Sequence, residues 1–166
     1  MTMTGNTLSS QSCRYWLLKS EPQVFSINDL QKAKKTLWDG VRNYQARNYM
    51  LNDMNRGDQI LFYHSNAEPP GIAGRAEVSK KAVPDLTALD SRSPYFDPKA
   101  KSDHPIWYCV EIVFKEKFPQ IIGLPTLRQV TSLKNMILLQ KGSRLSVQPV
   151  TPKEFQCILS LLPIEK

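Results

Sequence analysis

The feature that most constrains this fold is a pair of strand-like segments that follow each other closely near the middle of the chain. Residues 58–64 contain four consecutive apolar side chains, Ile60-Leu61-Phe62-Tyr63. Such continuity is typical of a strand that is buried on both faces. Residues 71–83 form a second strand pattern, in which Gly74 permits close approach of a neighbouring backbone. The short gap between the two segments indicates a hairpin-like pair.

Further strand and helix patterns surround this pair. Residues 15–18 indicate a buried first strand, and residues 106–118 indicate the longest strand. The other expected elements are a helix that begins after Ser26, a helix from Asn43 to about Met54, short helices near 86–90 and 124–130, a strand over 145–149 and a final helix that begins at Thr151. Residues 84–105 are rich in Pro, Asp and Ser and indicate a long excursion.

This order of elements favours an α+β fold over a doubly wound fold, because strands follow one another in the middle of the chain. We expect a PUA-like, curved and mostly antiparallel sheet or a small β-barrel, flanked by helices. The chain has 166 residues, of which 41% are apolar, so one domain can bury a sizeable core. We expect a disordered tail over residues 1–13 and a single domain over residues 14–163, without a membrane span.

Signatures of catalysis and metal binding are missing from the sequence. It contains no GxGxxG, P-loop, HExxH or GxSxG motif. Cys13, Cys109 and Cys157 are far apart, and His64 and His104 have no Cys or His nearby, so no zinc spacing occurs. We therefore expect no catalytic residue, metal or cofactor. Cysteine usage favours a reducing compartment, cytoplasmic or, in a eukaryote, nuclear.

Polar residues gather at the ends of the expected elements, in a chain with a formal net charge of +7. A positive balance favours polyanionic partners, although a merely solvated surface accounts for the charge equally well. Four segments stand out: Lys19-Ser20-Glu21-Pro22, residues 38–48 (WDGVRNYQARN), residues 62–66 (FYHSN) and residues 142–149 (GSRLSVQP). They combine one tryptophan, Trp38, with many hydrogen-bonding groups.

In this order and spacing, the four segments resemble the EVE domain, as found in the thymocyte nuclear protein family and its bacterial relatives. The resemblance extends from about Tyr15 to Leu162, and residues 38–48 together with GSRLSVQP are its most specific part. It implies a PUA-like fold, related to YTH and ASCH domains, with a pocket for a base at the edge of the sheet. EVE domains are thought to read modified cytosines in DNA, and YTH domains read methylated adenine in RNA. Trp38 takes a place similar to one cage tryptophan of YTH domains.

We therefore expect non-catalytic binding of a modified base, with modified cytosine first, in a DNA or RNA partner. Trp38 can stack on the base, and Glu21 or Asp39 can accept from the cytosine amine. The expected ligand-binding residues are Lys19, Ser20, Glu21, Trp38, Asp39, Asn43, Tyr44, Gln45, His64, Ser65, Asn66, Ser143, Leu145 and Ser146. The expected phosphate-binding residues are Arg42, Arg47 and Arg144.

The same residues have structural roles as alternatives to ligand binding. Trp38 can pin a turn as a core residue, Asn43 can cap a helix, and His64 can be a hydrogen-bonded structural residue. Trp16 and Trp107 lie in strand patterns and are expected in the core rather than in a base pocket.

Two other functions compete with base reading. ASCH relatives include amidohydrolases that use Lys and Glu near the pocket, so Lys19 and Glu21 leave an enzyme acting on a modified nucleoside open. A protein-interaction domain is the other alternative, with Tyr95 and Phe96 of the 84–105 excursion exposed for docking. A monomer is expected in each case.

Overall fold

Six strands and four α-helices make up the part of the chain that the computed structural model describes, residues 12–163. In chain order they are β1 (Tyr15–Ser20), α2 (Ile27–Ala33), β2 (Lys35–Leu37), α3 (Tyr44–Asn48), β3 (Gln59–His64), β4 (Gly71–Pro84), β5 (Tyr108–Gly123), α4 (Leu124–Arg128), β6 (Val147–Val150) and α5 (Pro152–Ser160). A π-helical turn at Tyr49–Asp53 continues α3, and 3-10 helices lie at Leu86–Leu89, Thr131–Leu133 and Ile137–Leu139.

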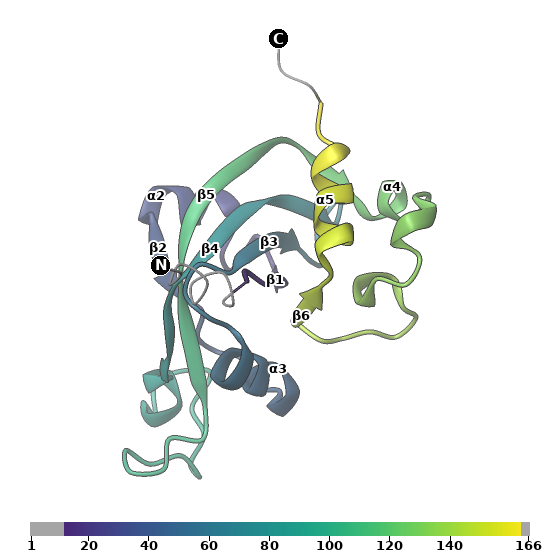
Figure 1. Ribbon diagram of the computed structural model, residues 1–166. Helices are drawn as coiled ribbons and strands as arrows, with labels where there is room; N and C mark the ends of the chain where they lie inside the picture. The colour runs from purple at the N-terminus through teal and green to yellow at the C-terminus, as the bar shows by residue number, and fades with distance from the viewer. Residues whose placement is uncertain (1–11, 164–166) are drawn as a thin grey trace, which may run out of the picture.

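The strands form one curved sheet in the order β2-β5-β4-β3-β1-β6 (Figure 1). β1 and β3 run parallel, whereas the other neighbouring pairs are antiparallel. Within residues 12–163 the edge strands β2 and β6 do not pair with each other, so the sheet is open. The predicted α+β class with a curved, mostly antiparallel sheet is therefore confirmed, in its open form.

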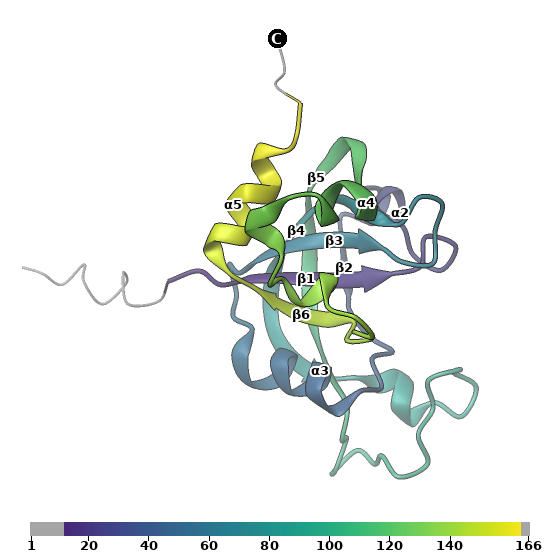
Figure 2. The same ribbon diagram turned by 90° about the vertical axis from the view of Figure 1, so that its right-hand side faces the viewer.

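Both faces of the sheet are covered, which explains the unbroken apolar run in β3. Ile60 and Phe62 point into one hydrophobic core with residues of α2 and α3, and Leu61 and Tyr63 point into a second core with residues of α4 and α5. Side chains alternate between the faces along a strand, so a strand between two cores needs apolar residues at successive positions. Figure 1 shows α4 and α5 together, on the other side of the sheet from α2, and Figure 2 shows α3 below β1, β3 and β6.

The helices begin where the sequence predicts caps. Ser26 and Thr151 each form a capping box with the acidic residue three positions later, at the starts of α2 and α5. The side chain of Asn43 accepts the Ala46 N–H at 2.9 Å and begins α3. These contacts confirm the predicted starts of α2, α3 and α5.

Two predicted strand boundaries are wrong. The longest strand runs over Tyr108–Gly123 rather than 106–118, because Ile106 has a φ of 65° and because the far end of β5 pairs with the start of β4. The last strand is Val147–Val150 rather than 145–149, because its pairing with β1 begins only at Val147. The sequence also gives no signal for β2, a three-residue edge strand that depends on its pairing with β5.

The predicted tail, residues 1–13, lies outside the described residues except for Ser12 and Cys13. Within the described range, no helix is long and apolar enough to cross a membrane. The same range contains no group of three or more His, Cys, Asp or Glu side chains placed to hold a metal ion.

Candidate functional site

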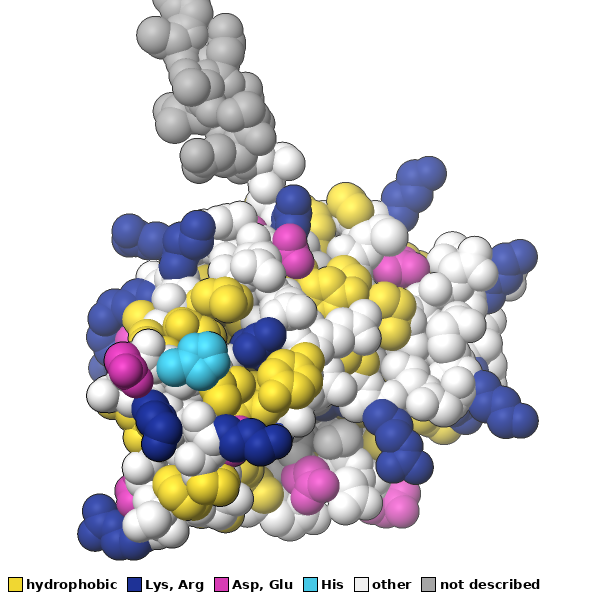
Figure 3. Space-filling view, turned by 90° about the horizontal axis from the view of Figure 1, so that it is seen from below, with side chains coloured by type: hydrophobic (Ala, Val, Ile, Leu, Met, Phe, Trp, Pro, Cys, Tyr) yellow, Lys and Arg dark blue, Asp and Glu magenta, His cyan; other side chains and the backbone are white. Residues whose placement is uncertain are grey.

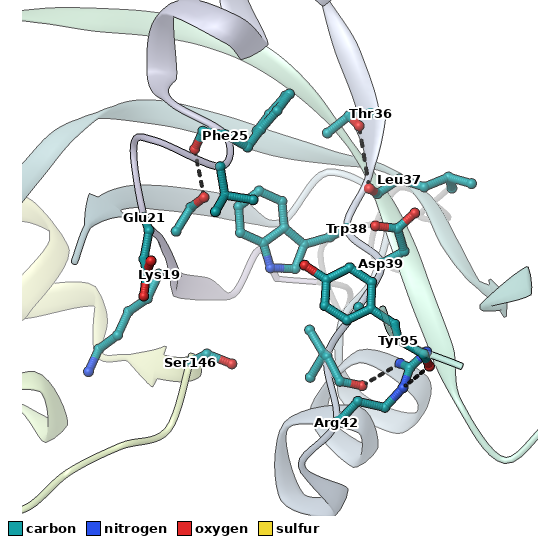
Figure 4. A pocket seen from close by; sticks show the side chains of 14 residues that line it. Lys19, Glu21, Phe25, Thr36, Leu37, Trp38, Asp39, Arg42, Tyr95 and Ser146 are labelled. Carbon is teal, nitrogen blue, oxygen red and sulfur yellow. Dashed lines mark hydrogen bonds between the residues drawn. The ribbon is translucent and has the colours of Figure 1, made fainter. Parts of the chain in front are cut away.

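A cavity of about 590 Å³ opens at the sheet edge, beside the ends of β1 and β2 (Figure 4). Four segments that are far apart in the sequence contribute to it: the end of β1 with the following turn, the residues around and after β2, one residue of the connection between β4 and β5, and one residue before β6. The lining consists of Lys19, Ser20, Glu21, Val24, Phe25, Thr36, Leu37, Trp38, Asp39, Gly40, Val41, Arg42, Tyr95 and Ser146. The volume lies within the range of about 300–1,000 Å³ that is common for small-molecule sites.

Trp38 lines this cavity although only 8% of the residue is exposed. Its backbone N–H donates to the Val110 carbonyl at 2.8 Å, so the chain still follows β5 directly after β2. Its ring packs edge-on against Phe62, with 5.5 Å between ring centroids, and against Phe25 at 6.4 Å. Trp38 is therefore a core residue and a cavity wall at the same time.

The indole N–H of Trp38 differs from those of the other two tryptophans. Trp16 and Trp107 each donate to an aspartate carboxylate, at 2.9 and 2.7 Å. Trp38 Nε1 has no hydrogen-bond partner within residues 12–163. It is also not fully buried, because the fully buried side-chain nitrogen or oxygen without a partner in that range is Gln148 Oε1. Trp38 Nε1 is thus not sealed in the interior. Buried polar groups in proteins normally have a hydrogen-bond partner. The unpaired N–H of Trp38 is therefore available as a donor to a molecule in the cavity.

Tyr95 supplies a second aromatic wall, which the sequence does not assign to the pocket. The residue is 37% exposed, and its ring packs closely on Gly40. A Cβ atom at position 40 would lie 2.8 Å from the Tyr95 ring, and Gly40 also has a φ of 82°. Glycine at this position therefore serves both the turn and the approach of the ring.

A hydrogen-bonded network fixes the Tyr95 segment against the segment after β2. The Arg42 guanidinium donates to the Tyr95 carbonyl at 2.7 and 3.0 Å and to Asp85 at 3.0 Å. The Asp85 carboxylate is buried and also accepts from the backbone of Gly40 and from Thr87. Burial opposes ionisation, but these hydrogen bonds outweigh it and hold the pKa of Asp85 below its ordinary value. Arg42 and the buried Asp85 therefore hold the backbone of Tyr95 in place.

Charged groups on the rim have shifted ionisation. Partial burial lowers the pKa of the Lys19 ammonium. Partial burial of the carboxyl, followed by the nearby Asp85 charge, raises the pKa of Asp39. The hydroxyl of Ser20 donates to the Phe25 carbonyl at 2.6 Å and so holds the turn that follows β1. The cavity therefore offers a cation, carboxylates and hydroxyls around an aromatic interior.

A family model of the EVE domain matches residues 14–161, nearly the whole described range. The chain belongs to the EVE domain family. Human thymocyte nuclear protein 1 is 42% identical to it over 95% of this chain and 77% of that protein.

Solved EVE domain structures agree with this membership. A protein from Pseudomonas syringae superposes with a TM-score of 0.86 at 50% identity, over 89% of this chain and 98% of that one. The crystal structure of human THYN1 protein in complex with DNA that contains 5-methylcytosine superposes with a TM-score of 0.84 at 41% identity. That match covers 92% of this chain and 99% of the human one.

The EVE domain brings seven of the predicted residues into the cavity lining. These are Lys19, Ser20, Glu21, Trp38, Asp39, Arg42 and Ser146. The other ten are not among the lining residues: Asn43, Tyr44, Gln45, Arg47, His64, Ser65, Asn66, Ser143, Arg144 and Leu145. For these ten, a ligand role stays a prediction.

Several of the ten have contacts within the EVE domain itself. His64 is buried, its Nε2 accepts the Ile27 N–H at 3.1 Å, and burial lowers its pKa. The Ser65 N–H donates to the Ser20 carbonyl at 2.9 Å, directly behind the cavity rim. Both residues therefore support the rim segments from behind.

The pocket residues that the sequence does not assign are mainly apolar. They are Val24, Phe25, Thr36, Leu37, Gly40, Val41 and Tyr95. Most lie within a few positions of assigned residues, so proximity in the sequence was an available signal for them. Tyr95 is different, because it arrives from a distant segment that the sequence marks only as exposed and aromatic.

Proposed function

We propose that this EVE domain binds a modified base of a nucleic acid in the cavity around Trp38 and Tyr95, without catalysis, and that the base is a modified cytosine. The observation that carries the proposal is an aromatic cavity whose Trp38 indole N–H has no partner within residues 12–163 and whose rim bears carboxylates. The complex of human THYN1 protein with DNA that contains 5-methylcytosine supports the choice of ligand.

The lining residues match the chemistry of a cytosine ring. The open ring of Tyr95 can stack on the base, and base–aromatic stacking contributes about 1–3 kcal/mol per base. The carboxylate of Asp39 or Glu21 can accept from the exocyclic amine. The Trp38 indole N–H can donate to a ring nitrogen or carbonyl oxygen of the same base.

A methyl group on the base would meet apolar surface. Val24, Phe25, Leu37 and Val41 line the cavity together with the aromatic rings. Burial of one methyl-sized group contributes about 0.8 kcal/mol, which corresponds to roughly fourfold in affinity. We therefore expect modest discrimination from burial alone, with the hydrogen bonds on the rim determining which base enters.

Phosphate contacts fall to cations that have no carboxylate partner within residues 12–163. Arg42 uses its guanidinium in hydrogen bonds to Asp85, Thr87 and two backbone carbonyls. We therefore assign the phosphates to Lys19, Arg47 and Arg144 rather than to Arg42. Such contacts add affinity without sequence preference and weaken with salt. The similarity to thymocyte nuclear protein 1 favours a nuclear location if the source is eukaryotic.

A binding panel tests the proposal. Matched oligonucleotides that carry 5-methylcytosine, cytosine or N6-methyladenine at one position are titrated with the native protein, Tyr95→Ala and Trp38→Phe. Trp38→Phe keeps an aromatic ring in the core but removes the indole N–H, whereas Trp38→Ala would also remove core packing. We expect preference for 5-methylcytosine in the native protein and weaker binding of the 5-methylcytosine oligonucleotide by both variants. Equal native affinity for all three oligonucleotides at physiological salt would contradict the proposal.

The enzymatic alternative has its own test. Lys19 is the amine that partial burial makes easier to deprotonate, so a nucleophilic role would centre on it. Incubation of stoichiometric protein with acylated and alkylated cytidines, followed by mass spectrometry, should give no product. Product formation that Lys19→Met abolishes would replace the binding proposal by a hydrolytic one.

A further inference from the structure

A second aromatic surface lies next to the cavity, where α3 meets the connection between β4 and β5. Tyr44, the first residue of α3, stacks on Trp107 with ring centroids 4.8 Å apart and an interplanar angle of 22°. Trp107 is buried, and its indole N–H donates to Asp97 at 2.7 Å. Tyr44 itself is 57% exposed. Tyr44 is therefore an open ring on a fixed support.

Arg42 connects this pair of rings to the cavity wall. Its guanidinium carbon lies 5.2 Å from the centroid of Trp107 and 5.8 Å from the centroid of Tyr95. Tyr95, Arg42, Trp107 and Tyr44 thus form a continuous row from the cavity to the open surface. A strand with one base in the cavity would bring nearby bases over Tyr44, because single-strand sites commonly extend over several nucleotides.

A positive charge accompanies the open ring. The Arg47 guanidinium carbon lies 4.9 Å from the Tyr44 centroid, and Arg47 has no carboxylate partner within residues 12–163. Its three hydrogen bonds go to the Ile106 carbonyl and the Asn48 amide oxygen, and a guanidinium has five N–H donors. Figure 3 shows Lys and Arg side chains interspersed with hydrophobic ones on the face seen from below.

We propose that Tyr44 is a second base-stacking position, which receives an unpaired base close in the strand to the base held in the cavity, with Arg47 at its phosphate. The proposal rests on the proposed function and narrows the partner to a single-stranded or locally opened segment of nucleic acid. The Tyr44 ring and the Arg47 charge complement this partner, because a nucleotide combines a π-face with a phosphate. The fixed Trp107 support keeps Tyr44 ordered before binding, which limits the entropy lost on association.

The test compares two single-stranded oligonucleotides that differ only beside the modified base. One carries 5-methylcytosine between thymines, and the other carries 5-methylcytosine between abasic nucleotides, with the same phosphates. Both are titrated by fluorescence anisotropy with the native protein, Tyr44→Phe and Tyr44→Ala. Tyr44→Phe is the matched control, because it keeps the ring and removes only the hydroxyl. Thermal unfolding of all three proteins checks that the Trp107 region stays folded.

We expect Tyr44→Ala to weaken binding of the thymine-flanked oligonucleotide by about fivefold to 150-fold, the range of one base–aromatic stack. Tyr44→Phe should bind as the native protein does, and the abasic oligonucleotide should bind Tyr44→Ala and native protein equally. Unchanged binding of the thymine-flanked oligonucleotide by Tyr44→Ala would overturn the stacking position. If Tyr95→Ala still loses binding in that case, the cavity function stands, whereas failure of the native protein to prefer 5-methylcytosine would overturn both.

Discussion

The Arg42 guanidinium donates to the buried carboxylate of Asp85 across 3.0 Å and thereby joins two segments that are 43 positions apart. The same guanidinium holds the Tyr95 carbonyl, so one ion pair connects protein stability with the shape of the cavity wall.

Removal of Arg42 should destabilise the protein strongly. Arg42→Met leaves the Asp85 carboxylate buried without its charged partner, which typically costs about 3–5 kcal/mol of unfolding free energy. Urea unfolding of the variant measures this loss. The matched control is Arg92→Met, which breaks an exposed pair with Asp90 and should cost about 0–1 kcal/mol. Similar losses in both variants would contradict a special role for the Arg42–Asp85 pair.

Gly40→Ala should disturb ligand binding beyond its effect on stability. The new Cβ atom meets the Tyr95 ring at 2.8 Å, so the ring must shift from its place in the cavity wall. The φ of 82° adds a cost of about 1–2 kcal/mol for a residue with a side chain. Gly57→Ala is the control, because Gly57 has a φ of 95° and no atom within 4 Å of the added Cβ. Only Gly40→Ala should weaken 5-methylcytosine binding, and equal binding by the two variants would contradict the assignment of Tyr95 to the wall.

The stability of the domain should fall as the pH decreases below about 6.5. Burial lowers the pKa of His64 in the folded state, so below the ordinary histidine pKa of 6.5 the unfolded chain binds a proton that the folded chain resists. Protonation would also remove the Nε2 acceptor that receives the Ile27 N–H. Urea unfolding at several pH values should show a slope in this range that His64→Gln reduces. His104→Gln, at an exposed position, should keep the slope, and an unchanged slope in His64→Gln would refute the explanation.

Binding of 5-methylcytosine should weaken in acid through Asp39. In the proposed complex the ionised carboxylate accepts from the cytosine amine. The pKa of Asp39 is raised above 3.8, so the ionised fraction falls at a higher pH than for an ordinary aspartate. Asp39→Asn should remove this component of the pH dependence. The free base titrates in the same way in both experiments, so the difference between the two pH profiles reports the Asp39 carboxyl and its coupling to the bound base. Identical profiles for native protein and Asp39→Asn would assign amine recognition to another group, and Glu21→Gln would be the next variant.

Local patterns in the sequence predict most of this fold. The caps at Ser26, Asn43 and Thr151 and the apolar run in β3 each reflect contacts within a few residues or a strong burial requirement. The sequence does not predict β2, because three residues are too few to show an alternating strand pattern. Its strand conformation depends on pairing with β5.

The same difference between local patterns and contacts of distant segments applies to the candidate site. Residues in the Lys19–Glu21 and Trp38–Arg42 segments are predictable, because polar residues at the ends of elements point to a rim. Tyr95 is not predictable as a wall, because its position depends on Gly40 and Arg42, more than fifty positions away. Its exposure in the sequence pattern instead suggested a protein-docking role.

The contact between the Lys19 N–H and the Ser146 carbonyl, 2.9 Å long, has a consequence for biogenesis. Lys19 is the penultimate residue of β1, and Ser146 immediately precedes β6, which pairs with β1. During synthesis, β1 therefore has one free edge until nearly the whole domain has left the ribosome. The rim of the cavity can close only after translation of the last strand, so a nascent chain that lacks β6 would not yet have a complete cavity.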